Sequence, residues 1–444
     1  MTPSRTRWAL ASLSLSMLLS SLGTSIANVA LPALAHAFGA SFRHVQWIVI
    51  AYLLASTTLI VGAGRLGDVL GRRRLLLAGL ALFTVASLVC GLAPVLWLLI
   101  AARAAQGLGA AAMMALAMAF VGDMVPKARI GRTMGLLGTT SAIGTALGPS
   151  LGGLLLGKLG WPAIFLVNVP LGLLGLLLAQ RHLPEDRPAP ETSGRERAGF
   201  DSVGTVLLAV TVAAYALAMT MFRDARLRTR LATSVLVSTV IMATLVVGPF
   251  YLSLSLGLGA VVVGLVLSVG PLVAAVTGLP AGRLADRFGP ERMTLFGLGG
   301  MAAGCVVLSV MPASLGVPGY VAPIALVTVG YALFQTANNT AVMANVVPSL
   351  RGVTSGLLNL SRNLGLITGA SVMGAVFAFG SASGDVATAR PEAVAAGMRL
   401  TFLVAALLIV VALVLAAGRR FSLSLLSLLS LLSRERAERA VAKA

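Results

Sequence analysis

The chain has 444 residues, of which 58% are hydrophobic and 11% are charged, and its mean hydropathy is +0.96. Soluble globular proteins carry about 25% charged residues, so this composition excludes a water-soluble enzyme or binding domain. Apolar runs recur along the whole sequence, and each is long enough to cross a bilayer as a helix. The sequence therefore predicts an all-α polytopic membrane protein.

The net charge of +19 would suit a nucleic-acid-binding protein, but the placement of the basic residues argues against one. Most of the 33 Lys and Arg residues fall in alternate loops or in the two tails, which is the positive-inside pattern of membrane proteins. Arg103 and Arg362 are exceptions, because they lie within apolar runs. We expect both termini in the cytoplasm and no nucleic-acid partner.

The first apolar run, residues 8–34, is longer than the apolar core of a signal peptide. It contains Thr24, Ser25, Asn28 and Pro32. Polar groups in a membrane span usually face a protein interior or a cavity. We therefore predict a first transmembrane helix whose Asn28 points inward, with a cleaved signal peptide as the alternative.

A short stretch rich in glycine and arginine joins the second and third runs, and it occurs twice. Residues 64–74 are GRLGDVLGRRR, and residues 282–292, which begin 218 positions later, are GRLADRFGPER. Glycine lets two helix ends turn back within a few residues, and Asp can cap a helix or pair with Arg. We expect two cytoplasmic loops that gate a conformational change rather than passive basic loops. The candidate gating residues are Gly64, Asp68, Gly71, Arg72, Gly282, Asp286, Arg287 and Gly289.

The fourth run contains an arginine at a depth that argues for a function. Arg103 follows Pro94 by nine residues, which is about 13 Å along a helix. An arginine that extends to the membrane surface is the alternative, but this is a long reach. Gln106 lies one turn further on, and we predict that both residues belong to the transport pathway.

The fifth run is rich in glycine. Gly144, Gly148 and Gly152 recur at four-residue spacing, which lets two helices approach closely, and Pro149 removes one backbone hydrogen bond. Tight packing alone is one interpretation, and a role in gating is the other. Asp123, at the end of the fourth run, is a further gating candidate.

The second half of the chain repeats the first. At an offset of 221, Gly365, Gly369 and Gly374 fall opposite Gly144, Gly148 and Gly153. Such a repeat predicts two six-helix bundles in the same orientation with a substrate site between them. We expect the second bundle's helices near residues 230–253, 260–281, 293–311, 318–345, 352–379 and 398–418.

This repeat divides the chain into five parts. We expect a first bundle at 1–181, a polar cytoplasmic linker at 182–200, an additional peripheral or tilted apolar helix at 201–222, a second bundle at 223–420, and a low-complexity cytoplasmic tail at 421–444.

The duplicated loop motif resembles that of the major facilitator superfamily, and Arg103-Ala104-Ala105-Gln106-Gly107 resembles the R-x-x-Q-G motif of its fourth helix. Residues 144–153 resemble the fifth-helix motif of its exporters, and residues 22–32 resemble the first-helix motif of the fourteen-span drug:proton antiporter branch. That branch usually has an acid where this chain has Gly23, and this chain lacks the second of its two extra helices.

The resemblance implies a major facilitator fold in a bacterial inner membrane, and a monomer that exports drug-like compounds by alternating access in exchange for protons. It implicates Arg103 in proton coupling. An importer or facilitator of organic anions on the same fold is an alternative, as is a non-transporting sensor or assembly protein.

Nothing in the sequence indicates an enzyme, a metal site or a cofactor. The three histidines lack metal-ligand spacing, and no phosphate-binding G-x-x-x-x-G-K-(S/T) motif occurs. The substrate and proton pathway must therefore use polar residues within the apolar runs. Our candidates are Asn28, Arg103, Gln106, Gln335, Asn338, Asn339, Asn359, Arg362 and Asn363.

The acidic residues set the charge of this pathway. None of the 14 acids lies in the middle of an apolar run, so we expect a net positive interior that suits neutral, amphipathic or anionic compounds. Asp68 and Asp123, at the ends of their runs, remain as candidates for the group that carries the proton.

Overall fold

The structure is a computed structural model that describes residues 3–125, 130–186, 225–344, 351–381 and 389–441. The described residues form helices and short connections, without a β-strand. The additional apolar helix expected at 201–222 and most of the expected linker lie outside the described residues.

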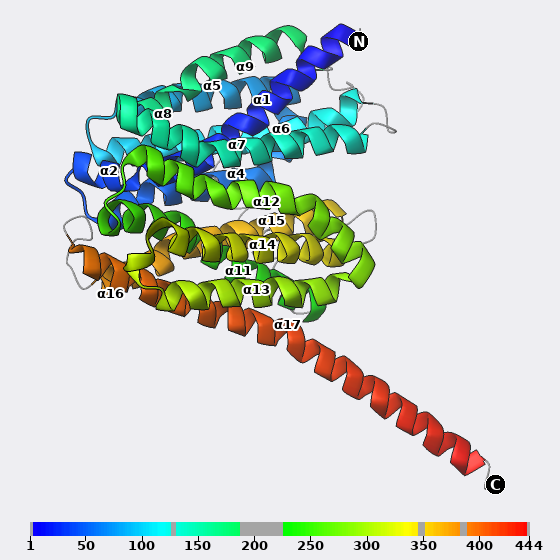
Figure 1. Ribbon diagram of the computed structural model, residues 1–444. Helices are drawn as coiled ribbons and strands as arrows, with labels where there is room; N and C mark the ends of the chain where they lie inside the picture. The colour runs from blue at the N-terminus through cyan, green and yellow to red at the C-terminus, as the bar shows by residue number, and fades with distance from the viewer. Residues whose placement is uncertain (1–2, 126–129, 187–224, 345–350, 382–388, 442–444) are drawn as a thin grey trace.

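The helices fall into an N-terminal half and a C-terminal half (Figure 1). The N-terminal half contains α1 (Pro3–Val29), α2 (Leu31–Ala37), α3 (Phe42–Val45), α4 (Trp47–Leu70), α5 (Arg72–Gly91), α6 (Leu96–Met124), α7 (Ile130–Leu159), α8 (Ala163–Leu166) and α9 (Asn168–His182). The C-terminal half contains α11 (Ala225–Phe250), η2 (Tyr251–Ser255), α12 (Ala260–Phe288), α13 (Pro290–Val310), η3 (Ala313–Leu315), α14 (Gly316–Met343), α15 (Arg351–Thr368), η5 (Gly369–Met373), α16 (Gly374–Gly380) and α17 (Pro391–Val441).

Eleven stretches of helix among the described residues are long and apolar enough to cross a membrane. Helix α4, with 24 residues, lies outside this set, and its side chains are described only in part. Five of the eleven stretches and α4 belong to the N-terminal half, and the other six belong to the C-terminal half. This all-helical architecture confirms the predicted polytopic membrane fold, because only helices or closed barrels satisfy every backbone group in lipid.

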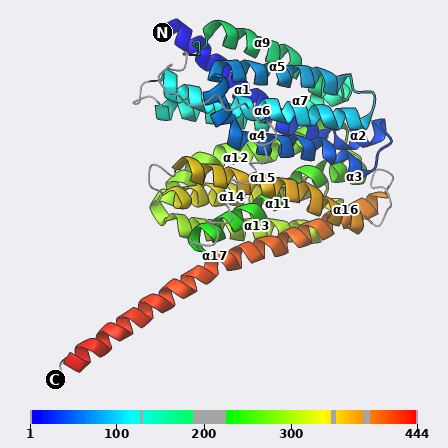
Figure 2. The same cartoon turned by 180° about the vertical axis from the view of Figure 1, so that it is seen from behind.

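The two halves lie side by side with their helices roughly parallel in both views (Figures 1 and 2). The α4–α5 and α12–α13 connections share one end of the molecule, at the right of Figure 1, which we call the hairpin end. The end with α2, α3, α8 and α16 is called the opposite end. The placement of both connections at one end is what a parallel repeat predicts.

The glycine-rich stretches differ from the predicted loops. Helix α4 continues through Gly64 and Asp68 to Leu70, and α12 includes Gly282, Asp286 and Arg287. Only Gly71 separates α4 from α5, and only Gly289 separates α12 from α13. These two residues have φ angles of 95° and 85°, a backbone conformation that favours glycine. The prediction of loops was wrong at these positions, because one glycine suffices for each turn.

Glycines also bring the helices of each half together in an equivalent way. On α7, added Cβ atoms at Gly144, Gly148 and Gly152 would meet α1 at Leu18, Ser25 and Val29. In the second half, added Cβ atoms at Gly365 and Gly369 would meet the carbonyl oxygens of Val235 and Thr239 on α11. The helix pair α7–α1 therefore repeats as α15/η5–α11, in the register that the offset of 221 predicts.

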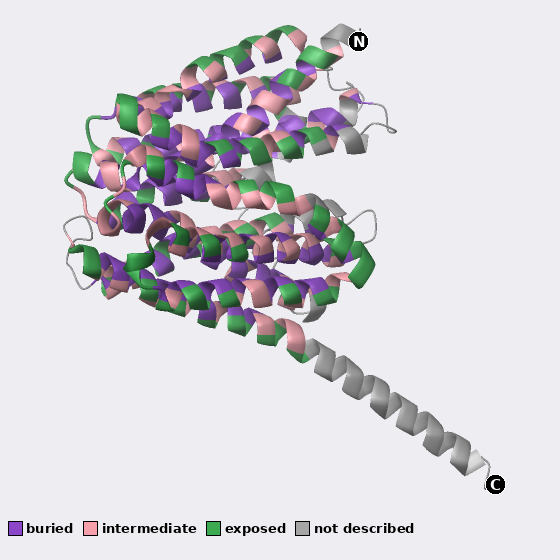
Figure 3. Cartoon of the chain, in the orientation of Figure 1, coloured by how far each residue is buried: buried purple, intermediate pink, exposed green. Residues whose placement is uncertain are grey.

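Side chains between the helices of each half are buried, and those on the outer surface are exposed (Figure 3). Many exposed side chains are large and apolar, such as Leu177 and Val414 at 53% and 60% exposure, which is expected of a surface that contacts lipid.

The last helix departs from the prediction at both ends. It begins at Pro391 rather than near 398, and it continues without interruption through Phe421 to Val441. The expected separate tail at 421–444 is therefore largely an extension of α17, which projects beyond the bundle (Figure 1).

Candidate functional site

Arg103 is the largest fully buried side chain of the described residues. It lies seven residues into α6, about 10 Å from the end of that helix at the opposite end. A buried guanidinium is costly unless hydrogen bonds satisfy it. The hydrogen-bond partners of Arg103 therefore show how the protein offsets the cost of burying this charge.

Neutral oxygen atoms satisfy most of the guanidinium. Nε donates to the carbonyl of Ile48 at 3.0 Å, and Nη1 donates to the carbonyl of Gly23 at 3.0 Å and to Gln106 Oε1 at 2.5 Å. Gln106 Nε2 in turn donates to Ser87 Oγ at 2.7 Å. The network ties α6 to α1, α4 and α5 without a carboxylate.

Aromatic rings complete the surroundings of Arg103. Its Cζ lies 4.2 Å from the ring centroid of Tyr52, and 5.9 Å from that of Phe165 on α8. The Tyr52 hydroxyl donates to the carbonyl of Ser20 at 2.8 Å. The second terminal nitrogen, Nη2, has no hydrogen-bond partner among the described residues. One terminal nitrogen of this buried cation, with its two N–H groups, thus has no partner among the described residues.

Gly23, where the resembling branch usually has an acid, lies next to this network. A Cβ at this position would lie 3.3 Å from Tyr52 Oη and 3.3 Å from two atoms of the Phe83 ring. Since the Gly23 carbonyl accepts a hydrogen bond from Arg103, the backbone supplies part of the negative potential that a side chain could provide.

Asn28 lies on α1 and is 3% exposed. Its Nδ2 is 3.5 Å from the carbonyl of Thr24, and its Oδ1 has no partner among the described residues. The structure thus buries it on α1, five residues beyond Gly23 on the same helix.

The three candidates on α14 have different surroundings. Asn338 is buried, and its Nδ2 is 3.5 Å from the carbonyl of Arg230 on α11, a contact between two helices. Gln335 and Asn339 are partly exposed, and Gln335 Nε2 is 3.4 Å from Asn339 Oδ1. The structure therefore brings Gln335 and Asn339 together and turns Asn338 towards α11.

On α15, Asn359 and Arg362 are exposed, and Asn363 is partly exposed. Their spacing of three and four residues puts them on one face of the helix. In the part of the chain that the structure describes, Arg362 makes no ion pair. Unlike Arg103, it is exposed.

Several gating candidates are only partly described. The side chains of Gly64, Asp68 and Asp123 are not described. Asp286 and Arg287 are exposed at the end of α12, and Arg287 Cζ lies 5.3 Å from the ring centroid of Phe288.

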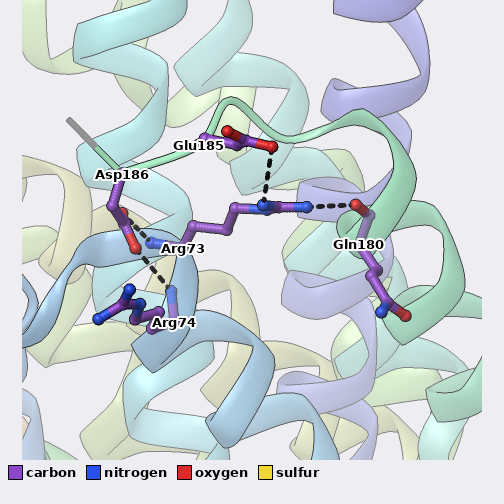
Figure 4. Close-up of polar contacts among 5 residues, drawn as sticks. All are labelled: Arg73, Arg74, Gln180, Glu185 and Asp186. Atoms are coloured by element: carbon purple, nitrogen blue, oxygen red, sulfur yellow. Dashed lines mark hydrogen bonds and ion pairs between the residues drawn. The ribbon is translucent and has the colours of Figure 1, made fainter.

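The segment that follows α9 makes polar contacts with the first hairpin, which is formed by α4, Gly71 and α5 (Figure 4). The Asp186 carboxylate accepts hydrogen bonds from the backbone N–H groups of Arg73 and Arg74, at 2.8 and 3.2 Å. Arg73 Nη2 donates to the carbonyl of Gln180 at 2.5 Å, and its Nη1 lies 4.0 Å from Glu185 Oε1. Asp186 therefore caps the N-terminus of α5 from 113 residues away.

The close glycine contacts between the two halves lie at the opposite end. An added Cβ at Gly153 of α7 would meet Ala260 and Gly264 of α12, and one at Gly374 of α16 would fall on the side chain of Gln46. Gly153 and Gly374 are equivalent in the repeat. The two halves are therefore joined by two equivalent contacts, α7 with α12 and α16 with the residue before α4.

Aromatic rings also join the two halves at the opposite end. The Phe42 ring of the N-terminal half contacts the rings of Phe250 and Phe377 of the C-terminal half, with centroid distances of 4.7 and 5.3 Å. Nearer the hairpin end, Gly138, Thr139 and Ala142 continue the Gly153 side of α7 and are exposed. The halves are thus closed together at the opposite end and less covered towards the hairpin end.

The sequence alone did not reveal the partners of Arg103. Tyr52, Ser87 and the Gly23 carbonyl come from three other helices, and no spacing in the chain links them to Arg103. Asp186 was also missed, because it lies within the polar stretch that we interpreted as a linker.

Known proteins resemble the chain in sequence. The model of the Major Facilitator Superfamily matches residues 13–370. The multidrug efflux pump LfrA of Mycolicibacterium smegmatis is 32% identical over 411 residues, covering 85% of this chain and 82% of the pump. The riboflavin transporter RibZ of Clostridioides difficile is 28% identical over 397 residues, covering 81% of this chain and 86% of that protein.

Solved structures share the fold. A bacterial homologue of the human lysosomal transporter Spinster, in an inward-facing and occupied conformation, superposes with a TM-score of 0.75 at 16% identity, covering 94% of this chain and 97% of that one. A D-xylose–proton symporter gives a TM-score of 0.67 at 16% identity, covering 90% and 96%.

Proposed function

Because the chain belongs to the Major Facilitator Superfamily, a family of membrane transporters, we propose that it exports small organic compounds by alternating access, coupled to proton entry. The protein is not an enzyme. Its substrate path, in this proposal, runs between the two halves.

One observation carries the alternating-access part of the proposal. The contacts made by Gly153 and Gly374 hold the halves together at the opposite end, while the Gly138 side of α7 is exposed towards the hairpin end. These contacts involve small residues, the neutral Gln46 side chain and aromatic rings, so the two bundles can part there and close elsewhere as rigid bodies.

Export rather than import is supported by sequence. Two multidrug proteins, LfrA and the resistance protein Stp of Mycobacterium tuberculosis, are 32% and 31% identical to this chain. The exporter-like glycines of α7 pack against α1, the helix that also supplies a carbonyl to Arg103. A movement of α7 would therefore reach the buried arginine through α1.

Proton coupling needs a group that can gain and lose a proton. Asp68 and Asp123, near the hairpin-end termini of α4 and α6, are our candidates. Arg103 would act as a fixed positive charge whose hydrogen bonds change when the halves rock.

Bacterial relatives imply a plasma membrane. We propose that the hairpin end faces the cytoplasm, since the arginines of both hairpins lie there and positive loops stay inside. We also propose a monomer, because one chain supplies both repeats.

Dye accumulation in cells tests the proposal. Bacteria that express the chain should retain several-fold less of at least one dye in a panel than bacteria that express Arg103→Met, and an uncoupler should abolish the difference. Higher accumulation that depends on the chain would instead establish import. If purified protein in liposomes moves no compound down any imposed gradient, a non-transporting sensor or assembly role replaces the proposal.

A further inference from the structure

Helix α15 has three distinct faces, and the first packs against α11. Added Cβ atoms at Gly365 and Gly369 would meet the α11 backbone, and Ser361 is 1% exposed on the same face. This contact fixes the rotation of α15 about its axis.

The second face is apolar. Leu364 and Ile367 lie one turn apart on it, and Leu364 is 38% exposed. The residue equivalent to Leu364 in the first half is Ile143, which is also exposed, at 46%. An exposed apolar stripe on a membrane helix belongs on the lipid side.

The third face carries Asn359, Arg362 and Asn363. At the offset of 221, Asn359 and Asn363 are equivalent to Gly138 and Ala142, which are exposed on the side of α7 that meets the other half, so this face borders the space between the halves. Two observations agree: α15 contacts α4 of the other half, and both views place α15 near the boundary between the halves (Figures 1 and 2).

Comparison with the equivalent residue of the N-terminal half shows what is unusual about Arg362. Its equivalent is Ser141, whose Oγ lies 2.5 Å from Ser21 Oγ on α1. The place of Ser21 is taken by Ser238 on α11, because Gly144 and Gly365 contact these two serines in the same way. The Ser238 hydroxyl is buried and has no partner among the described residues.

At the equivalent positions, a serine–serine hydrogen bond in one half is thus replaced in the other by an exposed guanidinium and by a buried hydroxyl without a partner among the described residues. Both groups can donate a hydrogen bond, and Asn359 and Asn363 add amide donors on the same face. This set matches a carboxylate, sulfonate or phosphate group.

The surrounding charge favours the same ligand. The acids on the described spans lie within a few residues of the helix ends, as Asp286 and Glu291 do, whereas Arg362 lies about 16 Å from the start of α15. Arg103 adds a second positive charge whose partners are neutral. In a low dielectric, both charges attract an anion and repel a cation.

We propose that the Asn359–Arg362–Asn363 face of α15 is an anion-binding subsite, and that the substrates are organic anions with an apolar body. Arg362 binds the anionic group and determines specificity. The inference rests on the proposed function, since it takes the space between the halves as the substrate path.

Charged thiol reagents test the local potential. Asn359→Cys places a thiol one turn from Arg362, and the two native cysteines, Cys90 and Cys305, are both buried. We would measure the rates of reaction with an anionic and a cationic methanethiosulfonate, each relative to its rate with free mercaptoethanol. The anionic reagent should be favoured on the order of tenfold, as expected of a unit charge nearby.

Arg362→Gln should remove most of this preference, whereas Arg390→Gln should leave it unchanged. Arg390 is exposed outside the spans, so that control variant has the same net charge. A thiol that does not react, a ratio near one, or equal effects of the two variants would overturn the assignment.

Export measurements with compounds of different charge test this inference separately from the proposed function. Among compounds that the chain exports, Arg362→Gln should reduce export of anions several-fold and spare neutral compounds. Export of a permanent cation, unchanged in Arg362→Gln, would overturn the substrate class while export itself stands. A charge preference at the thiol of the Asn359→Cys variant, together with chain-dependent uptake, would instead overturn export and leave the subsite intact.

Discussion

Arg103 holds a positive charge among carbonyl, amide and aromatic groups, and its stability depends on how well these neutral groups replace water. Each hydrogen bond to a charged group contributes about 1.5–3 kcal/mol, and a lost partner exposes the full cost of burial. Gln106 matters most, because it links Arg103 Nη1 to Ser87 Oγ.

We expect Gln106→Leu to lower the stability of the protein by about 1–3 kcal/mol, because Arg103 loses a hydrogen-bond acceptor that leucine cannot replace. Thermal unfolding in detergent would measure the change. Gln106→Glu is the matched control: it keeps the shape and adds a charge partner, so it should be tolerated. Equal losses in the two variants would contradict this account of the network.

At the residue scale, the sequence predicts a buried Arg103 from its depth in an apolar run, and the structure confirms the burial. The sequence also places Gln106 one helical turn from Arg103, and the structure shows a hydrogen bond between the two side chains. Tyr52 and Ser87 could not be found, because contacts between helices depend on how each helix is rotated.

Helix α5 begins directly after Gly71, so its first N–H groups need a cap that its own turn does not provide. Asp186 supplies it, and an added Cβ at Gly71 would fall on the Asp186 carboxylate. Glycine is therefore required at position 71 both for its φ of 95° and for space.

Asp186→Ala should cost about 1 kcal/mol, the usual contribution of an N-cap. Amide exchange at Arg73 and Arg74 should become several-fold faster, measured by hydrogen–deuterium exchange. Glu185→Gln serves as the control, because the Glu185 side chain is 85% exposed and its ion pair spans 4.0 Å, so its loss should change little. Protection that survives Asp186→Ala would show that another group caps the helix.

The glycines of α7 allow a comparison within one helix. Gly148→Val should impair folding strongly, by more than about 2 kcal/mol, because its Cβ would fall on Ser25. Gly138→Val should have a much smaller effect, since nothing lies within 4 Å of a Cβ there. Yield of monodisperse protein and the unfolding temperature would measure both. If the two variants behave alike, α7 does not depend on close contact with α1.

At the scale of elements, the apolar runs predict most helices, but their ends are less accurate. Helices α4 and α12 extend further than expected, because arginine and aspartate are compatible with a helix that emerges from the membrane. The repeat of glycines at an offset of 221 predicts that their two helices take equivalent places in the two halves, whereas the partner helices α1 and α11 were found only in the structure.

At the scale of the whole molecule, the described residues form two bundles that meet through equivalent elements, α7 with α12 and α16 with the start of α4. The sequence predicts this duplication from the repeat. It does not predict which end is closed, because one sequence serves every conformation of a transporter.

A disulfide across the closed end should stop transport. A Cβ at Gly157 would lie 2.8 Å from Val261 Cγ2, so Gly157→Cys and Val261→Cys together place two thiols within bonding reach. We expect the oxidised double variant to lose nearly all transport and to regain it on reduction, measured in liposomes. Each single variant is the control, and a locked protein that still transports would contradict alternating access.

The aromatic and glycine contacts at the closed end contain no ion pair among the described residues. Attraction between opposite charges weakens as salt is added, whereas apolar contact does not. The balance between closed and open forms at this end should therefore be almost independent of ionic strength, and should follow temperature and lipid composition instead. A cell that meets sudden changes in salinity would keep this gate working without adjustment.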